Sequence, residues 1–173
     1  MSAIISECGR YRYRLDRQCE GDGKTLVIMV NPSTADAVED DLTITKVRGF
    51  GNRNKWGQIM VGNLFSFRAT EIGQLSIADD PIGPENDYWL KDMIEQADRV
   101  VVAWGALEQK LPEHLRSRWQ HVCDMIPERL RPLLSIGPSL KGGHPRHPGR
   151  PSYSLPIIPW SLRHGGEAKF AGQ

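Results

Sequence analysis

The chain has 173 residues, of which 39% are hydrophobic and 25% charged, with a formal net charge of +1. This length suits one domain with one core, and the near-neutral charge gives no argument for a polyanionic partner held by bulk charge. The longest apolar runs, such as 26–30 and 100–104, are far shorter than the roughly 20 residues that span a bilayer, and the three cysteines include no Cys-x-x-Cys pair. We therefore expect a cytoplasmic protein without a membrane partner or a disulfide framework, and a monomer by default.

The first elements in the chain are predicted to be strands. Alternating apolar and charged residues at 11–15 indicate a half-exposed strand at a sheet edge. The continuous apolar runs at 25–30 and 58–65 are typical of strands that are buried on both faces, and Asn31-Pro32 ends the first of these. Further strands are expected at 99–104 and 133–136, and the apolar segment 157–160 closes the fold.

Helices are predicted between these strands. One begins at an N-cap offered by Asp40-Asp41 and ends near 49–51, and the others cover 85–97 and 112–126. This alternation predicts an α/β fold with three layers, in which helices cover both faces of a central, mainly parallel sheet of four to five strands. We expect a single domain over 1–160 and a polar C-terminal tail at 161–173.

Three unusual segments each follow a strand that is expected to lie inside the sheet. They are 31–36, 63–70 and 137–151. In such sheets, ligands bind beyond the carboxyl ends of the strands. We therefore expect Asn31-Pro32-Ser33 and the His147-Pro148 loop to form two walls of one active site.

The segment 31–36 carries groups suited to a polar ligand. Asn31 leaves a buried strand, and Ser33 and Asp36 add a hydroxyl group and a carboxylate, although Asn-Pro is also an ordinary turn dipeptide. The acidic residues that follow can either bind Mg²⁺ or cap the next helix. Capping is favoured for Asp40 and Asp41.

The segment 63–70 offers groups that can recognise a base. Asn63 ends a buried strand, and its amide can donate and accept hydrogen bonds at once. Either Phe65 or Phe67 can stack on a base, and we expect one of the two to pack in the core. Arg68 is a candidate for contacting a phosphate or carboxylate.

The third segment gathers two His, two Arg and three Pro within 144–151. Histidine can stabilise developing negative charge or move a proton, and arginine can hold phosphate. The alternative is a surface loop whose basic residues are incidental. His144-x-x-His147 lacks a clear third metal ligand, and the Walker, dinucleotide-binding, nucleophile-elbow and His-Glu-x-x-His motifs are absent. No metal or cofactor is therefore expected.

These segments resemble a bacterial and phage family catalogued only as domain-of-unknown-function family 1643. The resemblance extends from about Tyr11 to Trp160. It runs through Val-Asn-Pro-Ser-Thr-Ala-Asp, Asn-Leu-Phe-Ser-Phe-Arg-Ala-Thr, Asp80-Pro-Ile-Gly-Pro-Glu-Asn-Asp, Ala103-Trp-Gly-Ala and Gly-His-Pro-Arg-His-Pro. The resemblance is specific as a family assignment but implies little about function.

The same order of motifs is similar to that of the uracil-DNA glycosylase superfamily, whose members have a four-stranded parallel sheet between helices. Val30-Asn31-Pro32-Ser33 resembles the Gly-x-Asn-Pro motif of the mismatch-specific branch, although Met29 stands where that branch has Gly. Gly51-Asn52-Arg53-Asn54-Lys55-Trp56 is similar to its Gly-Asn-Arg-x-x-Trp stretch. His147-Pro148-Gly149-Arg150-Pro151-Ser152 resembles the superfamily's His-Pro-Ser-Pro motif with an altered spacer, which weakens the expected fit of this loop to a minor groove.

This second resemblance implies cleavage of the N-glycosidic bond of a uracil-type or modified base in DNA. Asn31, with Asp36, would hold the attacking water, and His147 would stabilise the departing base. Asn63, Ser33 and Phe65 would bind the flipped base. The residues implied in phosphate contact or in wedging the duplex are Arg68, Arg146, Arg150, Tyr153 and His144.

Two other functions fit the same residues. One is an enzyme that processes free nucleosides or nucleotides, and the other is a non-catalytic module that binds nucleic acid. The loop 137–153 distinguishes them: a loop that protrudes as a basic wedge favours DNA, whereas a loop that folds over the pocket favours a small ligand.

Overall fold

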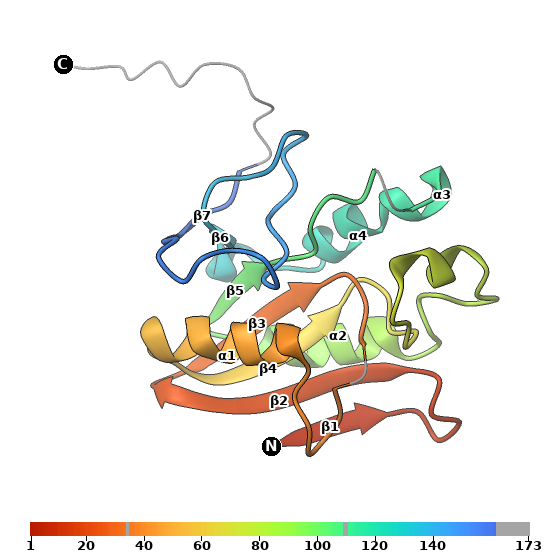
Figure 1. The fold of residues 1–173 in the computed structure, drawn as a ribbon, viewed down its shortest axis with the longest axis horizontal. Coiled ribbons are helices and arrows are strands. Elements are labelled where there is room, and N and C mark those ends of the chain that lie inside the picture. The colour runs from red at the N-terminus through yellow and green to blue at the C-terminus, as the bar shows by residue number, and fades with distance from the viewer. Residues whose placement is uncertain (34, 109–110, 162–173) are drawn as a thin grey trace.

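The computed structural model describes residues 1–33, 35–108 and 111–161, so the predicted tail lies outside the described residues apart from Ser161. Within these ranges, seven strands form one mixed sheet in the order β1-β2-β4-β3-β5-β6-β7 (Figure 1). Their bounds are β1 Ser2–Ile5, β2 Arg12–Gly21, β3 Lys24–Met29, β4 Trp56–Asn63, β5 Arg99–Val102, β6 Leu134–Ile136 and β7 Ile157–Pro159. The α/β prediction is confirmed, but the sheet is larger than the four to five strands expected.

The centre of the sheet is parallel. β3 pairs in parallel with β4 and β5, and β5 pairs in parallel with β6. The three additional pairings are antiparallel, with β1 and β2 on one side of this centre and β7 on the other. All four parallel strands therefore end at the same edge of the sheet.

The prediction of an edge strand at 11–15 was wrong. β2 lies between β1 and β4, so both of its sides are hydrogen-bonded. The two charged residues that suggest exposure have partners within the protein instead: Arg14 contacts Asp16 and Asp92, and the buried Arg12 donates a hydrogen bond to the Ala35 carbonyl at 2.6 Å. Ion pairs and a backbone acceptor thus replace solvent around these side chains.

Helices cover both faces of the sheet (Figure 1). Their bounds are α1 Leu42–Arg53, α2 Asn86–Gln96, α3 Glu113–Arg116 and α4 Arg118–Asp124, with 3-10 turns η1 Ile72–Ser76 and η2 Glu128–Leu130. The predicted capping is confirmed for α1, because the Asp41 side chain accepts a hydrogen bond from the Ile44 N–H at 2.8 Å. The single helix predicted over 112–126 was wrong, since Ser117 ends α3 and precedes α4.

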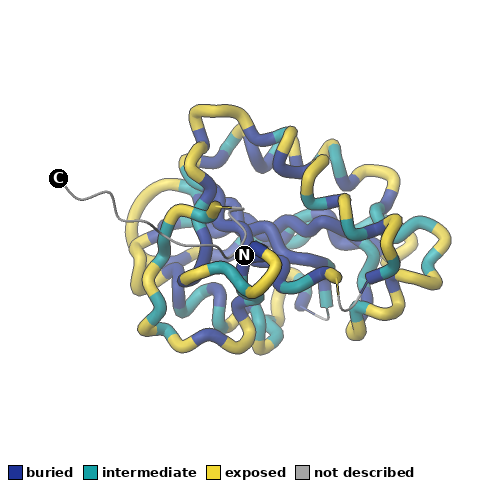
Figure 2. Tube along the Cα trace, turned by 90° about the horizontal axis from the view of Figure 1, so that it is seen from above, coloured by how far each residue is buried: buried dark blue, intermediate teal, exposed yellow. Residues whose placement is uncertain are grey.

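The core consists of two apolar clusters, one on each face. On β3, Leu26 and Ile28 belong to the cluster that includes α2, whereas Val27 and Met29 belong to the cluster that includes α1. Figure 2 shows the buried strands inside a shell of more exposed loops and helices. No described helix is both long and apolar enough to cross a membrane.

Candidate functional site

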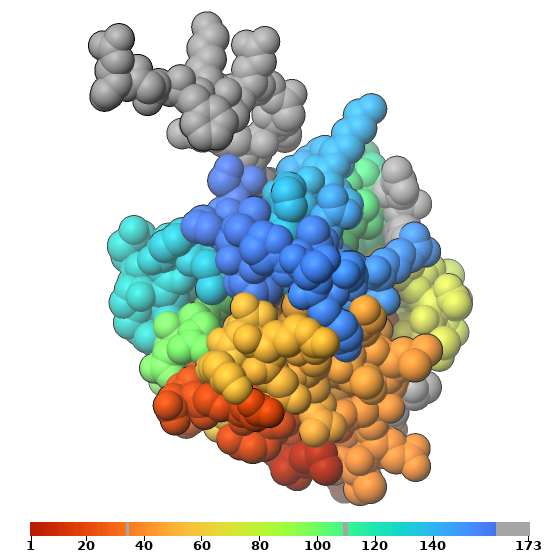
Figure 3. Space-filling model, turned by 60° about the vertical axis from the view of Figure 1, so that its left-hand side comes forward, coloured from red at the N-terminus to blue at the C-terminus, as the bar shows by residue number. Residues whose placement is uncertain are grey.

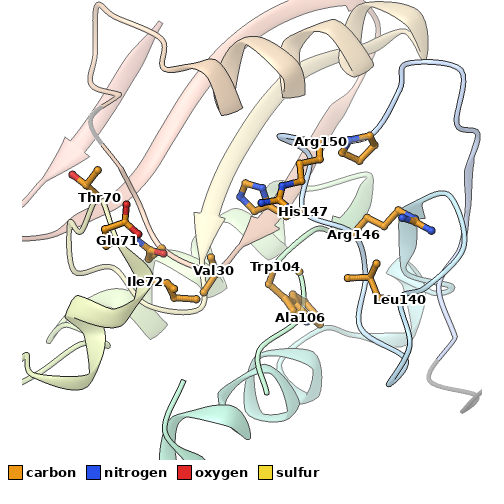
Figure 4. A pocket seen from close by; sticks show the side chains of 13 residues that line it. Val30, Thr70, Glu71, Ile72, Trp104, Ala106, Leu140, Arg146, His147 and Arg150 are labelled. Atoms are coloured by element: carbon orange, nitrogen blue, oxygen red, sulfur yellow. The ribbon is translucent and has the colours of Figure 1, made fainter. Parts of the chain in front are cut away.

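A pocket of about 560 Å³ lies beyond the carboxyl ends of β3 and β5, within the size range of small-molecule sites. Figure 4 shows Thr70, Glu71 and Ile72 on one side, with His147, Arg146 and Arg150 opposite. The full lining is Val30, Asn31, Thr70, Glu71, Ile72, Trp104, Gly105, Ala106, Leu140, Arg146, His147, Arg150 and Pro151. The strand-end rule thus locates this pocket correctly, and Asn31 and His147 both line it.

The amide of Asn31 has a defined orientation. Its Nδ2 donates to the carbonyl oxygens of Ala69, at 2.7 Å, and Pro32, at 3.2 Å. Because a carbonyl oxygen only accepts hydrogen bonds, the amide nitrogen must face these partners. The Oδ1 atom accepts no hydrogen bond from any described residue, so it can accept one from water or a ligand.

His147 is held close to the strand end on the opposite side. A Cβ atom placed on Gly105, directly after Trp104, would lie 3.2 Å from the Cβ of His147. The Gly149 N–H donates to His147 Nδ1 at 3.3 Å. This contact makes Nδ1 an acceptor, so a neutral ring carries its proton on Nε2.

The basic loop between β6 and β7 forms a wall of the pocket. Arg146 Nε donates to the Pro138 carbonyl at 3.0 Å, and the pocket residue Pro151 accepts a hydrogen bond from Lys46 of α1, also at 3.0 Å. Figure 3 shows this blue segment lying against the yellow-orange surface of α1. Arg146 and Arg150 therefore contribute positive charge to the pocket from an anchored loop.

Tyr153 belongs to this anchor. Its ring packs against Phe50 of α1 with ring centroids 5.0 Å apart. The Nζ atom of Lys46 and the guanidinium carbon of Arg53 each lie 4.1 Å from the centroid of the Tyr153 ring. The ring packs against α1 and does not line the pocket.

Trp104 contributes apolar surface to the pocket and is held from behind. Its Nε1 donates to Nδ1 of His144 at 3.2 Å, and His144 Nε2 lies 2.5 Å from the carboxylate of Glu108. His144 is only 4% exposed, and Trp119 packs edge-on against it. His144 is therefore not placed to contact a phosphate as predicted; it is buried and holds the orientation of Trp104 in the pocket wall.

Other predicted site residues lie outside this pocket. Asp36 accepts hydrogen bonds from the N–H groups of Glu39 and Val38, which lower its pKa, so its carboxylate closes a turn. Phe65 is fully buried in the core. Ser33 and Arg68 line a neighbouring, smaller hollow.

Asn63 is also fully buried, and neither polar atom of its side chain has a hydrogen-bond partner. Asn63 does not line the pocket, so the structure brings Asn31 and His147 together there but not the predicted base-reading amide.

The pocket also contains Glu71, Thr70 and Trp104, to which the sequence analysis assigned no role. Trp104 is the last residue of the predicted strand 99–104 and lies just beyond the observed end of β5 at Val102, so the strand-end rule could have included it. Glu71 follows the segment 63–70 by one residue, and its local pattern is that of a capping box with Gln74 at the start of η1, which gives no sign of a pocket role.

Near α1, Asp41 caps the helix and Asp40 forms ion pairs with Arg17 and Arg48. The described residues contain no group of three or more His, Cys, Asp or Glu side chains placed to hold a metal ion.

Comparison with protein families gives one match. Residues 12–149, most of the chain, match the model of a family described as "Protein of unknown function (DUF1643)". No curated protein and no solved structure matches the chain. The match confirms the family resemblance found in the motifs, while the resemblance to uracil-DNA glycosylases stays a prediction.

Proposed function

Because the chain belongs to the DUF1643 family, whose function is unknown, we propose a function from its pocket: hydrolysis of the N-glycosidic bond of a nucleotide unit. One observation carries this proposal. Asn31 and His147, which are far apart in the sequence, line the same pocket together with two arginines. Glycosidic-bond hydrolysis is the reaction that the motif resemblance implies, and the proposal assigns it to the side chains that line this pocket.

The reaction joins a water oxygen to the anomeric carbon and breaks the bond between that carbon and the base nitrogen. The departing base keeps the electron pair of the broken bond and must be stabilised or protonated. Asn31 supports the first event, because its fixed amide leaves Oδ1 to hold the water. His147 supports the second, because the neutral ring carries a proton on Nε2 that can be donated to the base.

The carboxylate in this proposal is Glu71. Attack by water is assisted by a group that takes its proton, and the sequence analysis expected the carboxylate of Asp36 to help hold this water. Asp36 is engaged in a turn outside the pocket, whereas Glu71 lines it (Figure 4). Glu71 lies on the side opposite His147, so the two groups flank the space in which the sugar would bind.

The remaining pocket residues suit the other parts of a nucleotide. Arg146 and Arg150 can hold a phosphate group. Trp104, Val30, Ile72 and Leu140 provide apolar surface for the base.

The test is release of a free base. The purified chain is incubated with oligonucleotides that contain uracil, a mismatch or a modified pyrimidine, and separately with the corresponding free nucleotides, and the released base is measured by chromatography. Replacement of His147 by Ala removes the donor to the departing base, so we expect base release to fall about 100- to 1000-fold. Asn31→Ala and Glu71→Gln should each lower the rate constant as well.

His114→Ala is the matched control, because His114 is exposed on α3 and does not line the pocket. It should release base at the rate of the parent protein. Absence of base release from the whole panel by the folded parent would overturn the proposal. Binding without product would instead support the non-catalytic module, and turnover of free nucleotides alone would support the nucleotide-processing enzyme.

A further inference from the structure

A second hollow, of about 340 Å³, adjoins the pocket. It is lined by Gly9 and Arg10 from the turn between β1 and β2, by Ser33 after β3, and by the segment 67–70 after β4. Thr70 lines both the pocket and this hollow, so the two share a wall. We call the second hollow the Arg10–Arg68 groove.

The groove is positively charged and partly aromatic. The guanidinium of Arg10 lies 5.9 Å from the ring centroid of Tyr11 and 5.7 Å from that of Phe67. Arg68 donates through one nitrogen to the Gly9 carbonyl at 3.3 Å, which holds the second guanidinium at the same place. No acidic side chain lines the groove.

Neither arginine forms an ion pair with a described acidic residue. The carboxylate of Asp36 interacts electrostatically with Arg68 from beyond ion-pair distance. One oxygen of this carboxylate accepts hydrogen bonds from two backbone N–H groups. Two guanidinium groups, the Ser33 hydroxyl and an aromatic ring are the groups that bind the backbone and bases of a nucleic-acid strand.

We propose, on the basis of the function proposed above, that the Arg10–Arg68 groove binds the phosphate of the nucleotide next to the one in the pocket. The substrate is therefore a single-stranded polynucleotide, or a strand opened at the target, and not a free nucleotide. The shared wall at Thr70 lets one chain occupy both hollows. Arg146 and Arg150 bind the strand on the pocket side, and Arg10 and Arg68 bind it beyond Thr70.

The test is binding measured by fluorescence anisotropy at several salt concentrations. The probes are a labelled DNA strand of about ten nucleotides, an RNA strand of the same sequence, and a nucleoside monophosphate as competitor. Loss of one phosphate contact makes the slope of log K against log salt shallower by about 0.7 for a single strand. We expect Arg10→Gln and Arg68→Gln each to produce this change, with about a three- to tenfold loss of affinity for the preferred strand.

Two control variants and one structural observation separate this result from a change in folding. Arg10→Lys keeps the positive charge and should retain the salt slope of the parent. Lys91→Gln removes a charge from the exposed surface of α2 and should change neither slope nor affinity. Arg10 donates no hydrogen bond from its side chain to a described residue, so its replacement leaves the Gly9 contact of Arg68 intact.

Parent-like strand affinity and salt slope in both arginine variants would overturn the inference. So would an equal loss of affinity for the monophosphate, because the groove would then belong to the mononucleotide itself. Both outcomes are independent of base release, so the catalytic proposal stands or fails separately.

Discussion

Gly105 determines how closely the His147 loop approaches the end of β5, and its replacement by Ala tests that contact. Gly105 has φ +79°, a left-handed conformation that costs an L-residue about 1–2 kcal/mol. The added Cβ atom would lie 3.2 Å from His147 Cβ, closer than an ordinary van der Waals contact of 3.4–4 Å. Relief requires a shift of a few tenths of an ångström, and overpacking of this kind costs about 1–3 kcal/mol.

Gly9→Ala is the matched control for backbone strain. Gly9 has φ +72°, and a Cβ atom there would meet nothing within 4 Å. Urea unfolding of the two variants should therefore show Gly105→Ala to be less stable than Gly9→Ala by about 1–3 kcal/mol. For a domain of this size, each kcal/mol lowers Tm by about 2–4 °C.

The same substitution should slow base release from a single-stranded oligonucleotide at saturating concentration, because it moves His147 away from its position in the pocket. A displacement of 1 Å can cost about 100-fold in rate, so we expect about a tenfold loss for this smaller shift. Gly9 lines the Arg10–Arg68 groove and not the pocket, so at saturating strand concentration Gly9→Ala should retain the parent rate. Equal stability of the two variants, together with parent-like base release by Gly105→Ala, would refute the inferred contact between Gly105 and His147.

Three further predictions concern the supports of the site and of the fold. His144→Phe leaves the Trp104 indole N–H without its acceptor, which should lower the free energy of unfolding by about 1–3 kcal/mol and change the near-ultraviolet circular dichroism, whereas His144→Gln should recover part of the loss. Burial raises the pKa of Asp40, but hydrogen bonds from Arg17 and a second arginine lower it further than burial raises it. The ionised Asp40 carboxylate therefore stabilises the fold fully above pH 3.8, and this stabilisation is lost as the pH falls through the lowered pKa. Asp40→Asn should therefore make the free energy of unfolding, measured with urea at several acidic pH values, depend less steeply on pH. An unchanged pH dependence would contradict this. Asp41→Ala removes the N-cap of α1 and should cost about 1 kcal/mol in thermal unfolding, while Asp41→Ser should cost less.

The sequence predicted the local elements well where one strong signal dominates. The apolar run at 25–30 identified β3, and Asp41 identified the start of α1, because burial on both faces and N-capping each need particular residues at particular places. The parallel direction of the central strands then followed from helices that alternate with them. This was enough to expect Asn31 and His147 at one edge of the sheet.

Side-chain roles within the expected segments were harder to predict. Phe65 and Phe67 are alternatives in the sequence, and the register of β4 and its exit decides that Phe65 is buried while Phe67 lines the groove. His144 and His147 lie three residues apart, yet one contacts Trp104 and Glu108 and the other lines the pocket. Each choice depends on partners that are distant in the sequence.

The sequence by itself indicated that Asn31 and His147 follow strands that end at the same edge of the sheet, since the order of buried strands and polar segments can be read along the chain. Only the tertiary structure decided that β2 lies inside a seven-stranded sheet, that Glu71 and not Asp36 supplies the carboxylate in the pocket, and that Asn63 is buried away from it. The physical reason is that burial and hydrogen-bond partners are set by segments that pack together from distant parts of the chain. The periodicity of apolar residues predicts whether a side chain is buried or exposed, and tertiary packing determines which residues from distant parts of the chain contact it.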